Sequence, residues 1–312
     1  MWITTSLQTV LTPNAVALGN FDGIHLGHRQ VIEPVLTARE AAVLRLYATV
    51  VSFSPHPRAF FSGQSLPLLS PFEERAALLE QTGVDQLVIL PFDRALAGLT
   101  PQEFVEAIIL TQLQAKHVSV GEDFRFGAKR AGDASLLKQL LTAHGIETTI
   151  VALQTLDGDR VSSSSVRQAL SRGDLTNATK LLGRPYRLSG RVIEGQQLGR
   201  TIGFPTANLQ VPLEKLIPAQ GVYGVRIFSK QLNQGEAILG VMNIGNRPTV
   251  NGLNQTIEVH VLDWEGDLYD QELTVELLEF IRPEQKFSSL DALKDQIQAD
   301  CLTARSRLAA AI

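Results

Sequence analysis

The sequence has almost no cysteine. Cys301 is the single one in 312 residues, so an internal disulfide bond and a thiolate metal site of the zinc-finger kind are both excluded. We expect Cys301 to be a small apolar residue on a helix. A chain without disulfides fits a reducing compartment, and we expect a cytoplasmic protein. The first residues lack a basic segment followed by an apolar one, so no export signal is expected.

The chain also lacks long apolar runs and basic clusters. No run of about 18 uncharged apolar residues occurs, so we expect no membrane-spanning segment. Lys and Arg are scattered and the formal net charge is −4, which argues against nucleic acid as a partner. Small phosphorylated ligands remain compatible with this charge, because a few donors at loops and helix N-termini bind them. We expect small-molecule substrates and a monomer or weak homo-oligomer.

The first part of the chain alternates apolar strand-like runs with amphipathic helical ones. This alternation predicts a mostly parallel sheet covered by helices on both faces. The expected elements are residues 14–19, 25–41, 46–53, 71–83, 86–92, 100–113, 115–121, 135–145 and 146–153. Pro34 should kink or break the first helix, because it removes one internal hydrogen bond. Two short helices follow at residues 166–172 and 175–182.

Arg184 and Pro185 mark the expected boundary between two domains, residues 1–183 and 184–312. Past it, short strands separated by Gly, Pro and Asn turns predict a small antiparallel barrel. The expected strands are residues 187–194, 222–228, 237–243, 256–263 and 273–280. A Ser-x-x-Asp signal at Ser288 predicts a closing C-terminal helix.

Residues 16–28, Val-Ala-Leu-Gly-Asn-Phe-Asp-Gly-Ile-His-Leu-Gly-His, read as an apolar strand, a glycine-rich turn and a helix start. This architecture is typical of phosphate binding. The glycines that let the backbone approach a ligand are Gly19, Gly23 and Gly27. His25 and His28 would project from one face of the first helical turn and donate to phosphate oxygens. Alternatively, the two histidines only start a helix. A zinc site would need a third ligand, and none accompanies them.

Residues 160–167, Arg-Val-Ser-Ser-Ser-Ser-Val-Arg, indicate a second anion site. The serines open a helix whose first turn holds Arg167, a cation that opposes the helix dipole. A bound anion would turn this penalty into attraction, and serine hydroxyls and backbone N–H groups would add donors. The serines could instead merely cap the helix while Arg167 bends into solvent.

Residues 203–209, Gly-Phe-Pro-Thr-Ala-Asn-Leu, place Thr206 and Asn208 two apart in extended chain, so their side chains face one way. Two neutral oxygen ligands suit a hard cation such as Mg²⁺, although an ordinary structural turn has the same pattern. Residues 195–201 partly match the phosphate-loop motif. This segment is one residue short and carries Arg for Lys, which argues against a P-loop NTPase.

Glu258 and His260 share one face of a predicted strand, because they alternate with Ile257 and Val259. Glu258 could accept a proton from a substrate hydroxyl, or this face could simply be solvated.

His56 stands in Phe-Ser-Pro-His-Pro-Arg at a strand end. It could line a nucleotide pocket, or belong to a loop that its prolines make rigid.

Taken in order, these motifs resemble the prokaryotic bifunctional riboflavin kinase/FMN adenylyltransferase family, also called FAD synthetase. The resemblance covers nearly all of the 312 residues. Six ordered segments carry it, which leaves little room for chance. They are residues 18–28, 54–58, 120–127, 160–167, 198–209 and 257–269.

The resemblance implies a Rossmann-like α/β nucleotidyltransferase domain in front and a six-stranded antiparallel riboflavin kinase barrel with a C-terminal helix behind. In the front domain it assigns the ATP phosphates to the His-x-Gly-His pair, His25 and His28, and to the serine-arginine helix start. That helix start comprises Ser164, Ser165 and Arg167. Asp123 and Phe124 would lie by the flavin or nucleotide pocket, as the family's Gly-x-Asp/Asn-Phe motif does.

In the barrel, the resemblance makes Thr206 and Asn208 the Mg-ATP ligands and Glu258 the catalytic base. The implied reactions are phosphorylation of riboflavin to FMN and adenylylation of FMN to FAD with release of pyrophosphate, both with ATP. Two alternatives remain. One is an enzyme with the front activity alone, against which the intact barrel residues argue, and the other is a flavin-binding carrier without turnover.

Overall fold

The computed structural model describes residues 1–195, 198–229, 232, 236–249 and 252–308. Contacts within the chain divide it into two compact units, Met1–Ser163 and Ser164–Ile312. Among the described helices, none combines the length and the apolar character needed to cross a membrane.

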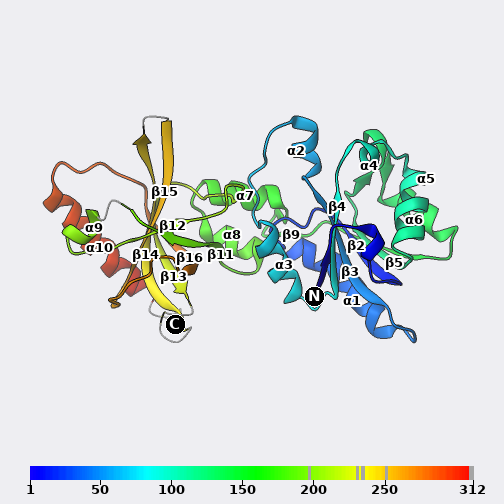
Figure 1. Cartoon of the computed structure of the whole chain (residues 1–312), viewed down its shortest axis with the longest axis horizontal. Coiled ribbons are helices and arrows are strands. Elements are labelled where there is room, and N and C mark those ends of the chain that lie inside the picture. Colours follow the sequence, from blue (N-terminus) through cyan, green and yellow to red (C-terminus); the bar gives the residue numbers. More distant parts are fainter. Residues whose placement is uncertain (196–197, 230–231, 233–235, 250–251, 309–312) are drawn as a thin grey trace. The chain divides into compact units, whose positions relative to one another are not determined.

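A six-stranded, wholly parallel sheet forms the centre of the first unit, with the strand order β1-β4-β3-β2-β5-β8 (Figure 1). Its strands are β1 (Trp2–Thr4), β2 (Asn14–Leu18), β3 (Tyr47–Ser54), β4 (Gln86–Pro91), β5 (Ala115–Gly121) and β8 (Glu147–Val151). The longer helices are α1 (Leu26–Ala41), α2 (Pro57–Ser62), α3 (Phe72–Glu80), η2 (Phe104–Gln112) and α6 (Ala134–Thr142). The short elements are η1 (Leu7–Thr9), α4 (Arg94–Gly98), α5 (Pro101–Glu103), η3 (Ala128–Arg130) and the ribbons β6 (Arg125–Phe126) with β7 (Gly132–Asp133) and β9 (Thr155–Leu156) with β10 (Asp159–Arg160).

The side chains of β2 alternate between two apolar cores, because successive residues of a strand point to opposite faces of the sheet. Val16 and Leu18 belong to the core that η2 and α6 cover. Ala15 and Ala17 belong to the core that α1 and α3 cover. Helices thus lie on both faces, which confirms the prediction from the alternating pattern.

Helix α1 does not break at Pro34. It runs from Leu26 to Ala41 with the proline inside it. Val31, Ile32 and Val35, on either side of that point, are buried in the core beneath the helix. Tertiary packing therefore holds both halves of the helix in place and overrides the local penalty of the missing hydrogen bond.

The second unit is a closed antiparallel barrel with associated helices. Its strand order is β11-β12-β15-β14-β13-β16, and β16 pairs back with β11. The strands are β11 (Tyr186–Ile193), β12 (Ala207–Gln210), β13 (Gly221–Phe228), β14 (Ile238–Thr249), β15 (Gly252–Val261) and β16 (Glu272–Arg282). The helices are α7 (Ser163–Ser171), which begins one residue before the unit, α8 (Leu175–Leu182), α9 (Leu198–Thr201) and α10 (Leu290–Leu308).

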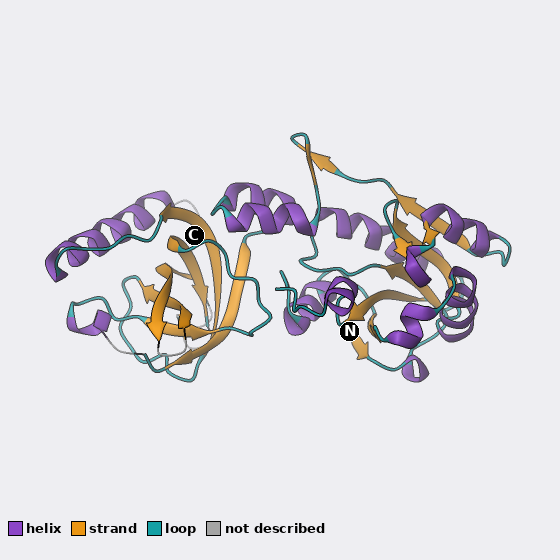
Figure 2. Ribbon diagram, turned by 90° about the horizontal axis from the view of Figure 1, so that it is seen from above, coloured by secondary structure: helices purple, strands orange, loops and turns teal. Residues whose placement is uncertain are grey.

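Alternation along the barrel strands separates an inner from an outer face. Tyr223, Met242 and Val259 are paired across β13, β14 and β15 and have no exposed surface. The neighbouring positions Val222 and Val241 point outward and pack against α10, which lies along the outside of the barrel (Figure 2). Cys301 is buried on α10, as the sequence predicts.

Candidate functional site

The loop between β2 and α1 has an unusual backbone. Phe21 and Ile24 adopt positive φ angles of 49° and 41°, and Gly23 adopts 90°. Phe21 and Ile24 are buried. Non-glycine residues in this region cost about 1–3 kcal/mol each and persist only where the surroundings impose the conformation. Such strained loops recur at functional sites.

His25 and His28 are brought together at the start of α1. His25 is the N-cap residue, and its Nδ1 accepts a hydrogen bond of 3.2 Å from the backbone N–H of His28. The two rings stack with centroids 3.6 Å apart and planes 16° apart. Two imidazoles therefore stand at a helix N-terminus, where the dipole favours an anion.

The glycines predicted for this loop lie where backbone and side chains approach closely. A Cβ on Gly27 would stand 3.3 Å from the His25 ring, and one on Gly19 would stand 3.1 Å from the Phe21 ring. Gly23 needs its left-handed conformation. A side chain at any of the three would press on the loop or strain it.

Asp22 fastens the loop to a segment nearly fifty residues away and was not predicted from the sequence. Its carboxylate accepts hydrogen bonds from the backbone N–H groups of Leu69 at 3.2 Å and Ser70 at 3.0 Å. The Ser70 hydroxyl in turn accepts one of 2.7 Å from the N–H of Gly23. The Ser163 hydroxyl donates to the Asp22 carbonyl oxygen at 2.9 Å. The first residue of α7 thus contacts the loop.

Arg75 of α3 is a second contact that the sequence did not reveal. Its Nη1 donates to the carbonyl oxygen of Asn20 at 3.1 Å and to Oγ of Ser52 at 2.9 Å. The Ser52 hydroxyl also donates to the Asn20 carbonyl at 2.9 Å. Arg75 is only 7% exposed. Its position on the apolar stripe of α3, four residues before buried Leu79, is the one sequence signal that could have identified it.

The other residues predicted for the first site lie at the ends of neighbouring elements. Asp123 forms an ion pair with Arg160, so the motifs around residues 123 and 160 do meet. Phe124 stacks on Phe126 with centroids 5.7 Å apart. His56 is the N-cap of α2, and its Nδ1 accepts from the N–H of Arg58 at 3.1 Å. Roles for these residues at a flavin or nucleotide remain predictions.

Ser164, Ser165 and Arg167 are in the first two turns of α7. They belong to the second unit, while the β2–α1 loop belongs to the first. Their assignment to the ATP phosphates also stays a prediction.

The predicted barrel residues gather where β12 meets β15. Oγ1 of Thr206 donates to Oε2 of Glu258 at 3.3 Å. Asn208 pairs directly with Glu258 across the two strands. Glu258 alternates with the inward-pointing Val259, so Glu258 and Asn208 lie on the outer face of the barrel. The structure therefore brings Thr206, Asn208 and Glu258 together.

Two glycines and a histidine lie close to Thr206, Asn208 and the residues before them. A Cβ on Gly195 would overlap the amide of Asn208, at 2.0 Å from Nδ2, and one on Gly199 would lie 2.3 Å from the carbonyl oxygen of Phe204. Nδ1 of His260 lies 2.8 Å from the carbonyl oxygen of Pro205. A carbonyl only accepts, so Nδ1 carries the proton and donates. The 204–208 segment is thus held from both sides.

The donor atoms at this place suit a hard cation. A threonine hydroxyl, an asparagine amide oxygen and a carboxylate are oxygen ligands of the kind that Mg²⁺ takes, together with waters and phosphate oxygens. The close approach of Gly195 leaves room for the Asn208 amide and for nothing larger on that side. The residues present therefore fit a magnesium ion.

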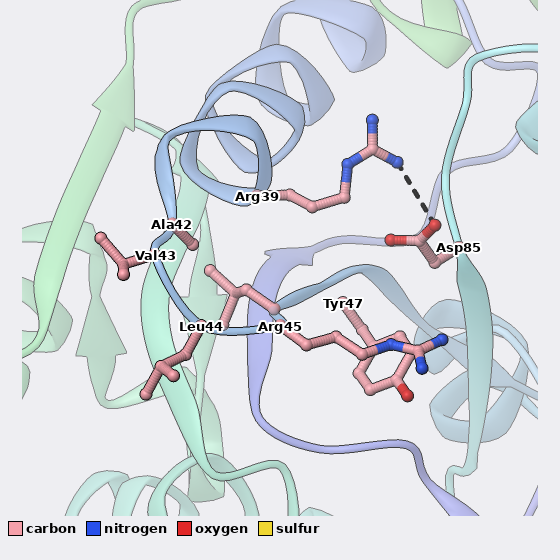
Figure 3. Close-up of a pocket in the computed structure, with 8 residues that line it drawn as sticks. Arg39, Ala42, Val43, Leu44, Arg45, Tyr47 and Asp85 are labelled. Carbon is pink, nitrogen blue, oxygen red and sulfur yellow. Dashed lines mark hydrogen bonds and ion pairs between the residues drawn. The ribbon is translucent and has the colours of Figure 1, made fainter.

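A surface hollow of about 430 Å³ lies elsewhere in the first unit, where α1 ends and β3 begins (Figure 3). Arg39 lines it and forms an ion pair of 3.3 Å with Asp85. None of the predicted site residues lines this hollow. It is at the end of α1 opposite to His25.

Two family models match the chain one after the other. A model described as FAD synthetase matches residues 7–165, and one described as riboflavin kinase matches residues 182–308. The first spans every strand of the parallel sheet except β1, and the second spans the barrel and α10.

Several curated proteins named bifunctional riboflavin kinase/FMN adenylyltransferase are similar along nearly their whole length. The protein of Haemophilus influenzae is 41% identical over 298 residues, which is 95% of this chain and 95% of the relative. The protein of Escherichia coli K12 is 44% identical over 293 residues, which is 93% of this chain and 91% of the relative.

A crystal structure described as a macrolide-efflux protein from Streptococcus pneumoniae has a TM-score of 0.86 and 31% identity. The match covers 97% of this chain and 98% of the Streptococcus pneumoniae chain. The match supports the fold, and the description belongs to the other protein. Both family models agree instead with the names of the Haemophilus and Escherichia relatives.

Proposed function

The chain belongs to the family of bifunctional riboflavin kinase/FMN adenylyltransferases, and from this membership we propose how its residues divide the two reactions. Riboflavin is phosphorylated to FMN by the barrel, and FMN is adenylylated to FAD by residues 1–183, which contain the parallel sheet, with ATP as the co-substrate of both. The observation that carries this conclusion is the succession of the two family models, each on its own fold.

Glu258 is proposed as the general base of riboflavin phosphorylation. Its carboxylate takes the proton of the 5′-hydroxyl while that oxygen bonds to the γ-phosphorus of ATP, the bond to the bridging oxygen breaks, and ADP leaves. No protein nucleophile is needed, so catalysis is mainly positioning and charge stabilisation. The 3.3 Å contact with Thr206 and the pairing with Asn208 support this role.

Thr206 and Asn208 are proposed to hold Mg²⁺ with ATP. When bound, the ion neutralises charge on the phosphate oxygens. The task of this chain is to present the hydroxyl and the amide oxygen in fixed positions next to the base. Gly195, Gly199 and His260 support that task, because they fix the 204–208 segment against β15.

His25, His28 and Arg167 are proposed to stabilise charge in FMN adenylylation. A phosphate oxygen of FMN bonds to the α-phosphorus of ATP, the bond to the β-phosphate breaks, and pyrophosphate leaves. The donors meet the charge that develops on the phosphate oxygens, and one such donor is typically worth about 10²–10³ in rate. Gly19, Gly23, Gly27, Ser164 and Ser165 are proposed to complete the phosphate site.

His56, Asp123 and Phe124 are proposed to line the flavin or nucleotide pocket of the same unit. Asp123 and Phe124 lie two and three residues after the end of β5, at the carboxyl end of the sheet. Ligands of open parallel sheets bind at that edge. Phe124 offers an aromatic face of the kind on which a flavin ring stacks.

We also propose Arg184 as the first residue of the riboflavin kinase domain, which divides the chain into residues 1–183 and 184–312. The riboflavin kinase model begins at residue 182, whereas the contacts divide the chain after Ser163. Helices α7 and α8 fill the interval. Gly183, with φ of 69°, ends α8 in a left-handed conformation just before the proposed boundary.

One incubation tests the whole assignment. The protein is given riboflavin and Mg-ATP, and the flavins are separated by chromatography. FAD is the expected product. Absence of any new flavin would indicate the adenylyltransferase activity alone, and riboflavin that stays bound but unchanged would indicate a carrier. Small-molecule partners, a cytoplasmic location and a monomeric or weakly associating state complete the proposal, and light scattering tests the last.

A further inference from the structure

Arg75 is a buried cation that neither reaction mechanism uses. It projects from α3 beneath the β2–α1 loop and is 7% exposed. Its Nη1 makes two hydrogen bonds, both to uncharged acceptors, the Asn20 carbonyl and the Ser52 hydroxyl. The buried Nε has no hydrogen-bond partner among the described residues.

The charge of Arg75 is not neutralised by a direct ion pair. Across the described part of the chain, no carboxylate oxygen lies within the 4.0 Å that defines an ion pair with this guanidinium. Burial lowers the pKa of Arg75, and the charge of nearby Asp22 opposes that shift. A guanidinium nevertheless stays protonated at neutral pH. A buried ion without a partner costs several kcal/mol, so its presence calls for a compensating role.

The contact that Arg75 makes is with the strained loop itself. Asn20 directly precedes Phe21, whose positive φ of 49° is one of the two costly conformations in the loop. In a trans peptide the C=O and the following N–H point in opposite directions. Arg75 and Ser52 hold the Asn20 carbonyl toward α3 and β3. The N–H of Phe21 therefore points away from α3 and β3.

A neutral donor could hold the same carbonyl. Ser52 already does so, with a hydrogen bond of 2.9 Å. The hydrogen bond alone therefore does not explain a guanidinium at this place. A positive charge in a dry site acts over a longer range than a hydrogen bond, because the low dielectric screens it weakly. Its field reaches an anion at the loop.

We propose that Arg75 is a positioning residue of FMN adenylylation, which holds the β2–α1 loop in its phosphate-binding shape and draws the ATP phosphates to it by its buried charge. This inference rests on the proposed function of the loop. Arg75 itself does not contact the substrate. It acts through the Asn20 peptide and through its field.

The test compares Arg75→Gln with Arg75→Lys in the full-length protein. Gln removes the charge and keeps an amide donor, while Lys keeps the charge and can donate to the Asn20 carbonyl. We expect Arg75→Gln to raise the KM for ATP in FMN adenylylation and the Kd for magnesium pyrophosphate by about tenfold or more. Arg75→Lys should stay within about threefold of the wild type. A thermal melt of each variant reports on folding of the first unit, and riboflavin phosphorylation in the same chain reports that the barrel is intact.

Arg39→Gln is the matched control. It removes one positive charge from the same unit, that of Arg39, which pairs with Asp85 (Figure 3). Arg39 is in the last turn of α1, about 20 Å along the helix from the end that joins the loop. Arg39→Gln should leave the Kd for pyrophosphate unchanged.

The inference is overturned if Arg75→Gln melts earlier but binds pyrophosphate like the wild type, or if Gln and Lys weaken binding equally. If Arg75→Gln does not fold, Arg75→Lys decides: a folded Lys variant with tenfold weaker binding overturns the charge role.

These outcomes are distinct from failure of the proposed function. A wild-type protein that makes no FAD from FMN and ATP would refute the function itself. A wild-type protein that makes FAD, with Arg75→Gln unchanged in its KM for ATP, would refute only the role of Arg75.

Discussion

Gly195→Ala should disable riboflavin phosphorylation through a clash with Asn208. An alanine Cβ would stand 2.0 Å from Nδ2 and 2.5 Å from Cγ of Asn208. Real Cβ atoms essentially never approach another heavy atom closer than 3.0 Å, so the Asn208 amide and the backbone at residue 195 must separate by about 1 Å more. A displacement of about 1 Å in a reacting geometry costs on the order of 10²-fold in rate.

The assay is kcat for FMN formation from riboflavin at saturating Mg-ATP, with a thermal melt of the same sample. We expect a decrease of about 10²-fold, while adenylylation of added FMN stays near the wild-type rate, because Gly195 contacts neither the β2–α1 loop nor the start of α7. Gly98→Ala is the control. A Cβ there meets nothing within 4 Å, so both activities should persist. Near-normal FMN formation in a folded Gly195→Ala protein would refute the metal-ligand role of Asn208 or its geometry.

Three further results are expected. His28→Ala should lower kcat for FMN adenylylation by about 10²-fold with riboflavin phosphorylation unchanged; a loss of about 1 kcal/mol of stability with normal turnover would show that His28 only starts the helix. His260→Ala should slow riboflavin phosphorylation about fivefold, the value of one hydrogen bond, and His260→Asn, whose amide can replace Nδ1–H, should restore it; equal rates in both variants would contradict the role of the Pro205 contact. Residues 184–312, expressed alone, should fold and make FMN but no FAD. If only the longer fragment 164–312 folds, the boundary at Arg184 is wrong.

Local patterns predicted most of the elements, because the periods of strands and helices report directly on which face is buried. The predicted strand 86–92 is β4, which ends one residue earlier, and the predicted helix 135–145 is α6, which starts one residue earlier and ends three residues earlier. The strand β12 was expected only as extended chain, since its four residues are too few to show a period. The break considered at Pro34 does not occur, and the sequence alone does not show the core that holds α1 together.

The sequence indicated which candidate residues lie together where those residues are close in sequence or on paired strands. The proximity of His25 to His28 and the face of β15 shared by Glu258 and His260 follow from helix and strand periodicity. The contacts that hold these residues in place do not follow from local geometry. Arg75 reaches Asn20 across 55 residues, and no local pattern specifies such a contact. The close approach of Gly195 to Asn208 likewise joins two segments that no local pattern relates.

The central claim is that one chain holds two separate active sites that act in succession. Asn208→Ala tests it most directly, since it removes a proposed metal ligand from the barrel and leaves the β2–α1 loop intact. The measurement is FAD formation by this variant from riboflavin and, in parallel, from FMN, each with Mg-ATP. The account predicts no FAD from riboflavin and near-normal FAD from FMN. Equal loss of FAD formation from both substrates in the folded protein would contradict it.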